Sequence, residues 1–506
     1  MQRRRLLAAA LGGSAAMLTD IRGVPQTVPD GPLSATPFTG STVSDLARAL
    51  AQQPHRNRST PLPREFQRLD YDTYRRVVFD REKAIWRDGN LPFQVLPHHR
   101  GFLFPDRVDL FEVVDGQAVP IRYSADQFSF DGMPVPERQE DIGFAGFRIL
   151  FPLNRADHFD ELCSFLGASY FRGLGRGHSY GISARGLAIR TADPAGEEFP
   201  NFTAFWLEKP APGAIAIRIH ALLESPSTTG AYAITITAGE NTTMEVDCTL
   251  FPRVDLPKIG IAPASSMFFF GPQDREGASD FRPAVHDSDG LMMLNGRGEQ
   301  LWRVLANPRD LQVSGFQDQA PRGFGLVQRS RAFHEFQDLG ARYERRPSLW
   351  VEPLEDFGPG EVQLVEIPTR SEIHDNIAAA WSPRQGLQAG APRRIRYRLH
   401  WLSEPQGPPG LARFAATRVA NSPGGGRRRL FVLDTTRLPR EISPLPLITA
   451  SSGQIIHVWT QENTETGGLR LSFEYEPGRA PVAELRARLT LGNIALTEDW
   501  MFRWTG

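Results

Sequence analysis

Strict alternation of apolar and polar residues recurs along this chain, and it favours a fold built from β-strands. Three such runs follow one another at residues 215–219, 232–236 and 244–250, and the turn sequence Ser-Pro-Ser-Thr-Thr-Gly separates the first two. Because such a run buries one face of a strand, the three runs predict an antiparallel meander. The pattern returns at 395–401, 469–475 and 482–491.

Helix signals are few by comparison. Ser44-Asp45 predicts the start of a short helix that ends at Gln52, and Asp160 predicts the start of another that runs through Leu166. The chain is therefore expected to be all-β.

The length of 506 residues exceeds that of an ordinary single domain. The segment SPRQGLQAGAP, residues 382–392, interrupts two structured stretches and predicts a boundary. We expect a large antiparallel β-sandwich over residues 40–385. The last 115 residues, 392–506, have the size and strand spacing of a small immunoglobulin-like sandwich.

Charge and cysteine content exclude several classes of protein. The chain has 58 acidic and 57 basic residues, which argues against a nucleic-acid partner because such proteins carry a basic surface. Two cysteines are too few for a disulfide scaffold. Cys248 alternates with apolar neighbours, so we expect Cys163 and Cys248 to be buried free thiols.

The N-terminus predicts export. Three arginines at positions 3–5 precede an apolar run of 13 residues, Leu6–Leu18, too short to span a hydrocarbon core of about 30 Å. The Arg3-Arg4 pair resembles a twin-arginine signal. Residues 1–35 are thus expected to be an export signal and a flexible segment, and the protein is expected in the periplasm. The alternative is a short amphipathic helix.

Common cofactor and metal motifs are incomplete. The run Gly173-Leu-Gly175-Arg-Gly177 lacks the third glycine and the βαβ context of a dinucleotide loop. In GISARG, Arg185 stands where a nucleophile elbow requires glycine. His98-His99 and the HDSD run from His286 do not have metal-ligand spacing. No cofactor and no metal are predicted.

Acidic and aromatic residues concentrate between Asp280 and Trp381. Carboxylates and arginines bind sugar hydroxyls, aromatic faces stack on pyranose rings, and glycoside hydrolysis needs two carboxyl groups. The clustered acids are Asp287 and Asp289, which stand beside His286, and Glu352, Glu355, Asp356, Glu372 and Asp375. An equally weighted alternative is that they cap loops and line the surface.

Long strings carry a resemblance to a known family. They are LPFQVLPHHRGFLF from Leu91, DIGFAGFRILFPLN from Asp141, FLGASYFRGLGRGHSYGISARGLAI from Phe165, GEEFPNF from Gly196, HDSDGL from His286, PRGFGLVQRSRAF from Pro321 and RRPSLWVEP from Arg345. Over residues 40–400 the chain resembles the periplasmic glucan biosynthesis proteins, the OpgG/OpgD (formerly MdoG/MdoD) family. The arginine-rich signal is more similar to the OpgD branch.

The resemblance implies a galactose-mutarotase-like sandwich followed by an immunoglobulin-like domain, and a role in making osmoregulated periplasmic glucans. It further implies an anomer-inverting glycoside hydrolase acting on β-1,2-linked glucan. By resemblance, Asp375 is the general acid, Asp287 the general base and Glu372 a further cleft acid. Such enzymes hold their carboxyl groups about 6.5–9.5 Å apart, and burial beside an acid raises the pKa of the general acid.

The candidate sugar-binding residues are claimed as a set, because each aromatic alone is equally expected in a core. They are Tyr170, Arg172, Arg176, Tyr180, His286, Asp289, Trp302, Tyr343, Arg346, Trp350 and Glu352. The chain departs from the family pattern at SEIHDNI, with Ile373 and His374, and at EPLEDFG. Both departures lie beside the expected cleft.

Two alternatives to the hydrolase stay open. One is an inverting transglycosylase that closes β-1,2-glucan into rings. The other is a noncatalytic glucan-binding or assembly factor that works with the inner-membrane glucan glucosyltransferase. The oligomeric state is left open between monomer and homodimer.

Overall fold

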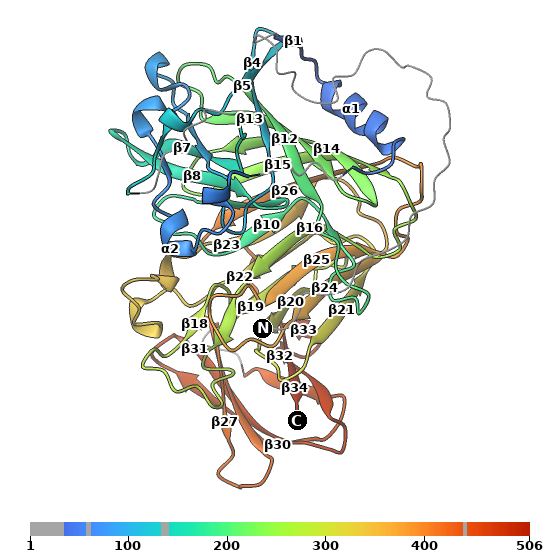
Figure 1. Cartoon of the computed structure of the whole chain (residues 1–506). Coiled ribbons are helices and arrows are strands. Elements are labelled where there is room, and N and C mark those ends of the chain that lie inside the picture. Colours follow the sequence, from blue (N-terminus) through green and yellow to red (C-terminus); the bar gives the residue numbers. More distant parts are fainter. Residues whose placement is uncertain (1–34, 57–61, 133–140, 439–442) are drawn as a thin grey trace.

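The computed structural model describes residues 35–56, 62–132, 141–438 and 443–506, so the predicted signal lies almost wholly outside the described residues. Nearly all regular structure in the described part is β-strand, which confirms the all-β prediction (Figure 1). The α-helices there are α1 (Thr42–Ala51) and the short α2 (Tyr71–Tyr74). Helix α1 matches the predicted first helix, and its buried Val43 and Ala47 pack in a small cluster with Leu222.

The largest sheet has 16 strands and runs the length of the molecule. Its order is β1 (Thr36–Pro37), β5 (Gln117–Ile121), β4 (Asp109–Val114), β12 (Asn201–Glu208), β13 (Ala216–Glu224), β14 (Thr228–Thr237), β15 (Thr242–Pro252), β26 (Arg393–Leu402), β23 (Ser348–Pro353), β22 (Gly323–Val327), β19 (Gly290–Leu294), β20 (Gln300–Val304), β34 (Asp499–Thr505), β32 (Val482–Leu491) and β29 (Leu445–Ala450), with β33 (Ile494–Ala495) on β32.

A ten-stranded sheet covers one face of this sheet. Its order is β21 (Gln312–Asp318), β24 (Gly360–Glu366), β25 (Ile377–Pro383), β16 (Ile259–Ser266), β10 (Ser183–Arg185), β9 (Tyr170–Gly173), β8 (His158–Leu166), β7 (Gly146–Arg155) and β3 (Gln94–His98), with β11 (Ala188–Ile189) on β16. The smaller sheets are β27 (Phe414–Asn421), β28 (Arg429–Thr435), β31 (Gly468–Glu476) and β30 (Gln454–Asn463); β17 (Phe268–Phe270) with β18 (Val285–His286); and β2 (Val78–Phe79) with β6 (Phe128–Ser129).

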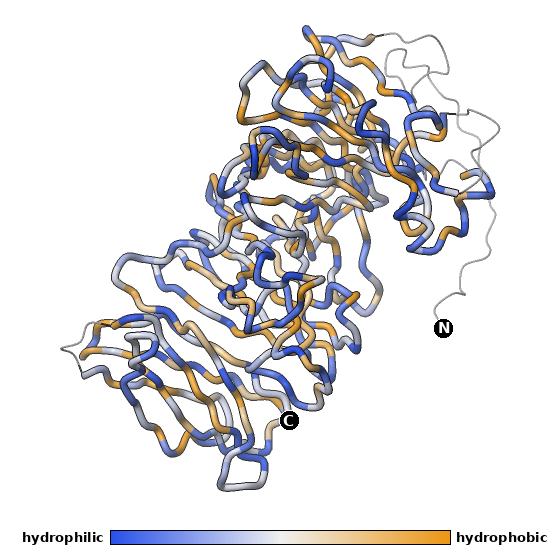
Figure 2. Tube along the Cα trace, turned by 90° about the vertical axis from the view of Figure 1, so that its left-hand side faces the viewer, coloured by the Kyte–Doolittle hydropathy of each residue, from blue (hydrophilic) through white to orange (hydrophobic). Residues whose placement is uncertain are grey.

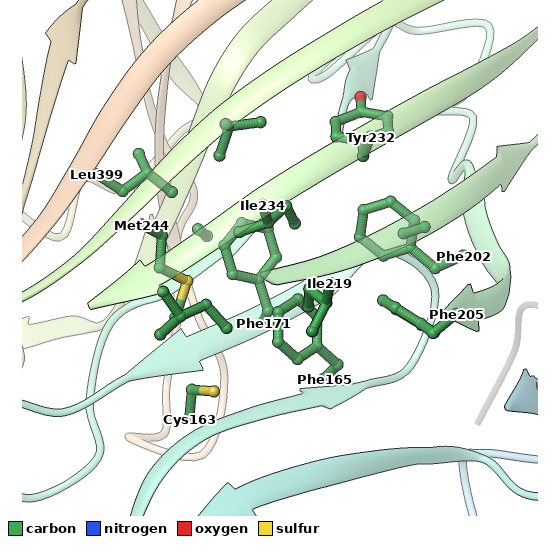
Figure 3. Packing of buried hydrophobic residues seen from close by; sticks show 14 of the residues in the cluster. Cys163, Phe165, Phe171, Phe202, Phe205, Ile219, Tyr232, Ile234, Met244 and Leu399 are labelled. Atoms are coloured by element: carbon green, nitrogen blue, oxygen red, sulfur yellow. The ribbon is translucent and has the colours of Figure 1, made fainter. Parts of the chain in front are cut away.

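The predicted meander is confirmed by β13, β14 and β15, which pair antiparallel in sequence order. Ile219 lies opposite Ile234, and Ile236 lies opposite Met244, so their side chains share the inner face. Figure 3 shows Ile219, Ile234 and Met244 with Phe165 and Phe171, from the second sheet, in the first hydrophobic core. Apolar and polar residues alternate along the traces of many strands in Figure 2, which is the pattern that predicted them.

Two local predictions are settled differently. The helix predicted from Asp160 to Leu166 is wrong, because this segment forms strand β8 between β7 and β9. Pairing on both sides, with Leu162 and Phe165 buried in the core, outweighs a weak capping signal. The prediction of free thiols is confirmed: Cys163 and Cys248 are buried and unbridged.

Strand β26 follows the predicted boundary but lies inside the large sheet, between β15 and β23. The segment of residues 382–392 is therefore a connection between two strands of the large sandwich. Its Pro and Gly content reflects a turn, and the chain first leaves the large sandwich after Leu402.

Three strands of the large sheet, β19, β20 and β22, are buried on both faces. On β19, Leu291 and Met293 face the first core, whereas Met292 faces a second core. On β20, Leu301 packs against the first core, whereas Trp302 and Val304 face the second. The second core lies between this part of the large sheet, together with β32 and β34, and the four-stranded sheet of β27, β28, β31 and β30. We call this four-stranded sheet and the core that it covers the C-terminal sandwich.

A buried ion pair lies where the C-terminal sandwich meets the large sheet. The Arg329 guanidinium, which follows β22, donates to both carboxylate oxygens of Glu498 at 2.5 and 2.9 Å. Glu498 also accepts hydrogen bonds from the backbone of Phe414 at 2.8 Å and from Gln300 at 2.6 Å. Both charged side chains are almost fully buried. The pair is thus well satisfied, and each partner depends on the other.

We expect Glu498→Ala to lower the free energy of unfolding by about 3–5 kcal/mol, because it leaves the Arg329 charge buried without a partner. Urea denaturation measures the change. Glu465→Ala, at an exposed turn, is the matched control and should change stability by less than about 0.5 kcal/mol. Equal effects of the two substitutions would contradict the structural role of the pair.

Candidate active site

Asp287 carries a buried carboxylate in the site. It follows β18, and its backbone N–H donates to the Met267 carbonyl at 2.8 Å. Its side chain is only 4% exposed and accepts a short hydrogen bond from the Arg346 guanidinium. Burial raises the pKa of Asp287 to about 6, against the opposing effect of Arg346, and the neighbouring charge of Asp375 raises it further.

Arg346 is held in place from two sides. Its guanidinium lies over the Tyr343 ring, 4.2 Å from the centroid, and Tyr343 is itself buried. The stem of Arg346 passes Gly181, where an added Cβ would lie 2.9 Å from Arg346 Cβ. The backbone N–H of Ser179 also donates to the Arg345 carbonyl at 3.0 Å. The loop before β10 therefore fixes the arginine that contacts Asp287.

Asp375 lies in the loop before β25, and its neighbour Asn376 fixes that loop. The Asn376 side chain accepts from the Phe268 N–H at 2.8 Å and donates to the Ile367 carbonyl at 3.0 Å. The Asp375 side chain remains about one-third exposed, 4.0 Å from the Arg172 guanidinium. Desolvation raises the pKa of Asp375, while Arg172 and Arg346 oppose the rise.

A polar row on the outer face of the ten-stranded sheet supports this acid. Phe171 and Ala184 face the core, so the adjacent Arg172 and Ser183 face outward, and Arg172 donates to the Ser183 hydroxyl at 2.7 Å. Ser183 in turn pairs with Ser265 on β16. Tyr170 lies two residues before Arg172 on the same face, and Asp375 is among the charges that act on its pKa.

The two carboxylates therefore share one electrostatic site. Arg172 and Arg346 each lower the pKa of both Asp287 and Asp375, so neither arginine belongs to one acid alone. The acids come from segments 88 residues apart, and the structure brings them within reach of the same two cations. Two carboxyl groups with raised pKa values beside arginines can exchange protons with a substrate or water near neutral pH.

Glu372 is bound by a neighbouring arginine. Arg282 contacts Glu372 at 2.7 Å, Asp280 at 2.8 Å and Asp338 at 2.9 Å. Arg282 thus ties three loops together beside the site. Glu372 is about one-third exposed and so retains a surface for a ligand.

Two other predicted sugar-binding residues lie in or next to the loop before β10. The Tyr180 hydroxyl donates to Glu161 at 2.9 Å, and Glu161 also contacts Arg148 at 3.4 Å. Arg176 is exposed and donates to the Leu153 carbonyl at 3.2 Å. Tyr180 directly precedes Gly181, which lies against Arg346, whereas Arg176 forms no hydrogen bond or ion pair with either acid in the described part of the chain.

His286 and Asp289 have structural partners in the described chain. His286 is fully buried, stacks on Phe268 and hydrogen-bonds with Gln328 at 2.8 Å. Burial lowers the pKa of His286, which favours its neutral form. Asp289 accepts the backbone N–H groups of Arg329 and Ser330. The structure thus separates both residues from the Asp287 side chain between them.

Three more predicted residues lie on the far face of the large sheet. Trp302 is 3% exposed and lies beneath Arg329, 3.6 Å from the ring centroid. Trp350 packs against the second core. Glu352 accepts from Arg398 at 3.1 Å and His400 at 2.8 Å. The side chains of Trp350 and Glu352 point away from the first core, because Leu349 and Val351 occupy it.

Sequence reasoning missed four residues of the site: Ser183, Ser265, Arg282 and Asn376. Strand β10 has only three residues, too few for a periodic signal. Ser265 lies in a strand that is buried throughout. The Asp375-Asn376 dipeptide was the available signal, since it stands directly before an apolar strand.

Within the described ranges, no group of three or more His, Cys, Asp or Glu side chains is arranged to hold a metal ion. A search of the same residues finds no helix with the length and apolarity needed to cross a membrane.

Comparisons with known proteins cover almost the whole chain. A family profile described as "Periplasmic glucan biosynthesis protein, MdoG" matches residues 38–504. "Glucans biosynthesis protein G" of Rhodopseudomonas palustris (strain BisA53) is 49% identical, over 100% of both chains. Proteins of the same name from Bradyrhizobium diazoefficiens and Vibrio cholerae (strain N16961) are 48% and 49% identical, over 100% and 92% of this chain and 100% and 87% of their own lengths.

We expect Arg346→Gln to raise the pKa of Asp287 above about 6, because the substitution removes a cation that stabilises the ionised carboxylate. Titration of the aspartate carboxyl carbons by NMR measures the change. Arg346→Lys retains the charge and should leave this pKa closer to that of the unmodified protein. An unchanged titration in both variants would show that Arg346 does not act on Asp287.

Proposed function

We propose, since the chain belongs to the periplasmic glucan biosynthesis protein family, that it hydrolyses the β-1,2-linked backbone of a periplasmic glucan with inversion of the anomeric carbon. The observation that supports this most strongly is the pair Asp287 and Asp375. Both have raised pKa values, both are influenced by Arg172 and Arg346, and they come from separate loops. Inverting hydrolysis requires two carboxyl groups with opposite proton roles.

In the proposed reaction Asp375 is the general acid. Its carboxyl group supplies a proton to the departing glycosidic oxygen, directly or through a sugar hydroxyl or water. The raised pKa of Asp375 favours the protonated form that this role needs. A glucan that fills the site would exclude water from this partly exposed side chain, which would raise its pKa further.

Asp287 is the general base in this proposal. It accepts a proton from the water that attacks the anomeric carbon from the opposite face of the sugar. The Arg346 hydrogen bond favours the ionised form of Asp287, and a pKa of about 6 leaves it mostly ionised at neutral pH. The proton that Asp375 loses is thus balanced by the proton that Asp287 gains.

Several side chains around the pair are suited to bind sugar. Arg172, which donates to the buried Ser183 hydroxyl, offers its remaining N–H groups on the outer face of the sheet, and Tyr170 adds an aromatic ring. Glu372 adds a carboxylate held by Arg282. We propose that these residues form the glucose subsites nearest to the scissile bond.

Other expectations remain proposals. The relatives carry the designation G, whereas the arginine-rich N-terminus predicted the OpgD branch. Export through the twin-arginine route and a partnership with the membrane glucosyltransferase are likewise proposed. They concern residues 1–34, which lie outside the described part, and proteins beyond this chain.

Asp375→Asn and Asp287→Asn should each lower the hydrolysis of linear β-1,2-glucan at least about 100-fold, because each removes one proton-transfer group. Reducing ends released by the purified protein measure the rate, and circular dichroism verifies folding. Glu352→Gln is the matched control. Its carboxylate lies on the far face of the large sheet, so its activity should stay within about twofold of the unmodified protein.

Product masses distinguish the alternatives in the same assay. Closed rings with no rise in reducing ends would show that the protein is a transglycosylase and not a hydrolase. Glucan that binds but stays unchanged would contradict both enzymatic proposals and leave a binding factor.

The specificity constant kcat/KM should fall as the pH drops below about 6, because protonated Asp287 cannot accept a proton from water. Since Asp287 and Asp375 interact, this limb reports the titration of the pair. A pH profile between 4.5 and 8, with folding checked at each pH, measures it. A constant rate from pH 7 to pH 4.5 would rule out Asp287 as the base.

A further inference from the structure

A groove lies between the large sandwich and the C-terminal sandwich, apart from the acid pair. We call it the arginine groove, and it encloses about 1480 Å³, including space open to solvent. Four segments and two arginines line it: residues 273–276, 306–309, 419–421 and 502–506 with Arg427 and Arg429. None of these residues forms a hydrogen bond or ion pair with Asp287 or Asp375, so the groove is a separate feature.

Basic side chains outnumber acidic ones in this groove. Five arginines line it, at positions 275, 309, 427, 429 and 503, against two acids, Asp274 and Glu276. Glu276 is already paired with Arg429 at 3.3 Å. Asp274 accepts the Asn307 N–H at 2.8 Å, and burial raises its pKa.

Three of the five arginines have partners. Arg275 donates to the backbone carbonyls of Asp280, Arg282 and Pro283, and Arg503 pairs with Glu484 at 2.5 Å. Arg309 and Arg427 are exposed, and neither forms a hydrogen bond or ion pair with the part of the chain that the structure describes. Arg427 contacts the Trp504 ring, 5.3 Å from its centroid, which restricts where its guanidinium lies.

The walls of the groove are joined by direct bonds. The Val419 N–H donates to the Pro272 carbonyl at 3.1 Å, and Arg503 donates to the Val313 carbonyl at 3.1 Å. The first bond connects the C-terminal sandwich to the large sandwich, and the second connects β34 to β21. Arg309 lies between β20 and β21 of the large sandwich, and Arg427 lies between β27 and β28 of the C-terminal sandwich, so each contributes one exposed arginine to the same groove.

We propose that the arginine groove binds a ligand through its phosphoryl groups, with Arg309 and Arg427 as the main contacts. Guanidinium groups bind phosphoryl oxygens in a planar, bidentate geometry, and a doubly charged phosphoryl group can use two of them. A carboxylate carries one charge and would satisfy fewer of these donors. This proposal is independent of the proposed hydrolysis.

Pyrophosphate is the probe, and isothermal titration calorimetry of the full chain in low salt is the measurement. We expect saturable binding that weakens as sodium chloride is added. The double variant Arg309→Gln/Arg427→Gln should bind at least about tenfold more weakly, because it loses both unpaired cations. Arg297→Gln, which removes an exposed arginine outside the groove, should bind like the unmodified protein. Acetate, with one carboxylate, should bind more weakly than pyrophosphate.

The absence of binding, or equal binding by the double variant, would overturn the proposal. If the double variant does not fold, each single variant serves instead, and each should weaken binding. Arg309→Lys/Arg427→Lys should restore part of the affinity, because it retains charge but loses the bidentate geometry. Glucan hydrolysis should be unchanged in the double variant, which separates failure of this proposal from failure of the proposed function.

Discussion

The burial of β19, β20 and β22 on both faces is the constraint on which the rest of the structure depends. These strands contribute to the first core through residues such as Leu291 and Leu326, and to the second through Met292 and Val327. The sandwiches therefore share one sheet and cannot move as independent bodies without breaking that sheet. The ion pair of Arg329 and Glu498 lies at the same junction. A Cβ at Gly290, the first residue of β19, would collide with the Trp302 ring, so this position requires glycine.

The same constraint places the proposed base. Asp287 stands three residues before β19, in a segment whose other side chains are fixed. His286 packs in a buried cluster, Ser288 hydrogen-bonds with Ser266 at 2.7 Å, and Asp289 binds the backbone after β22. Asp287 alone points to Arg346. The free energy of packing these neighbours thus holds a carboxylate in a site where burial disfavours its charge, as is common in active sites.

Periodicity predicted the class of the fold and many strands, since alternation at 482–491 matches β32. It did not show that β26 returns to the large sheet, because strand pairing depends on distant residues. Composition and resemblance named Asp287, Asp375, Glu372, Arg172 and Arg346, which the structure places around one site or bound beside it. Composition could not separate them from Trp302, Trp350 and Glu352. In the sequence, an aromatic residue or an acid on the far face of the large sheet has the same kinds of neighbours as one in a cleft.

The central claim is that Asp287 and Asp375 act together as base and acid in an inverting hydrolysis. The most direct test is proton NMR of linear β-1,2-glucan during the first minutes of reaction with the purified protein, before the product anomers equilibrate. The account predicts that the newly formed reducing ends appear first as the α-anomer and that Asp375→Asn forms none. First products in the β-configuration, or turnover by Asp375→Asn at the rate of the unmodified protein, would contradict it.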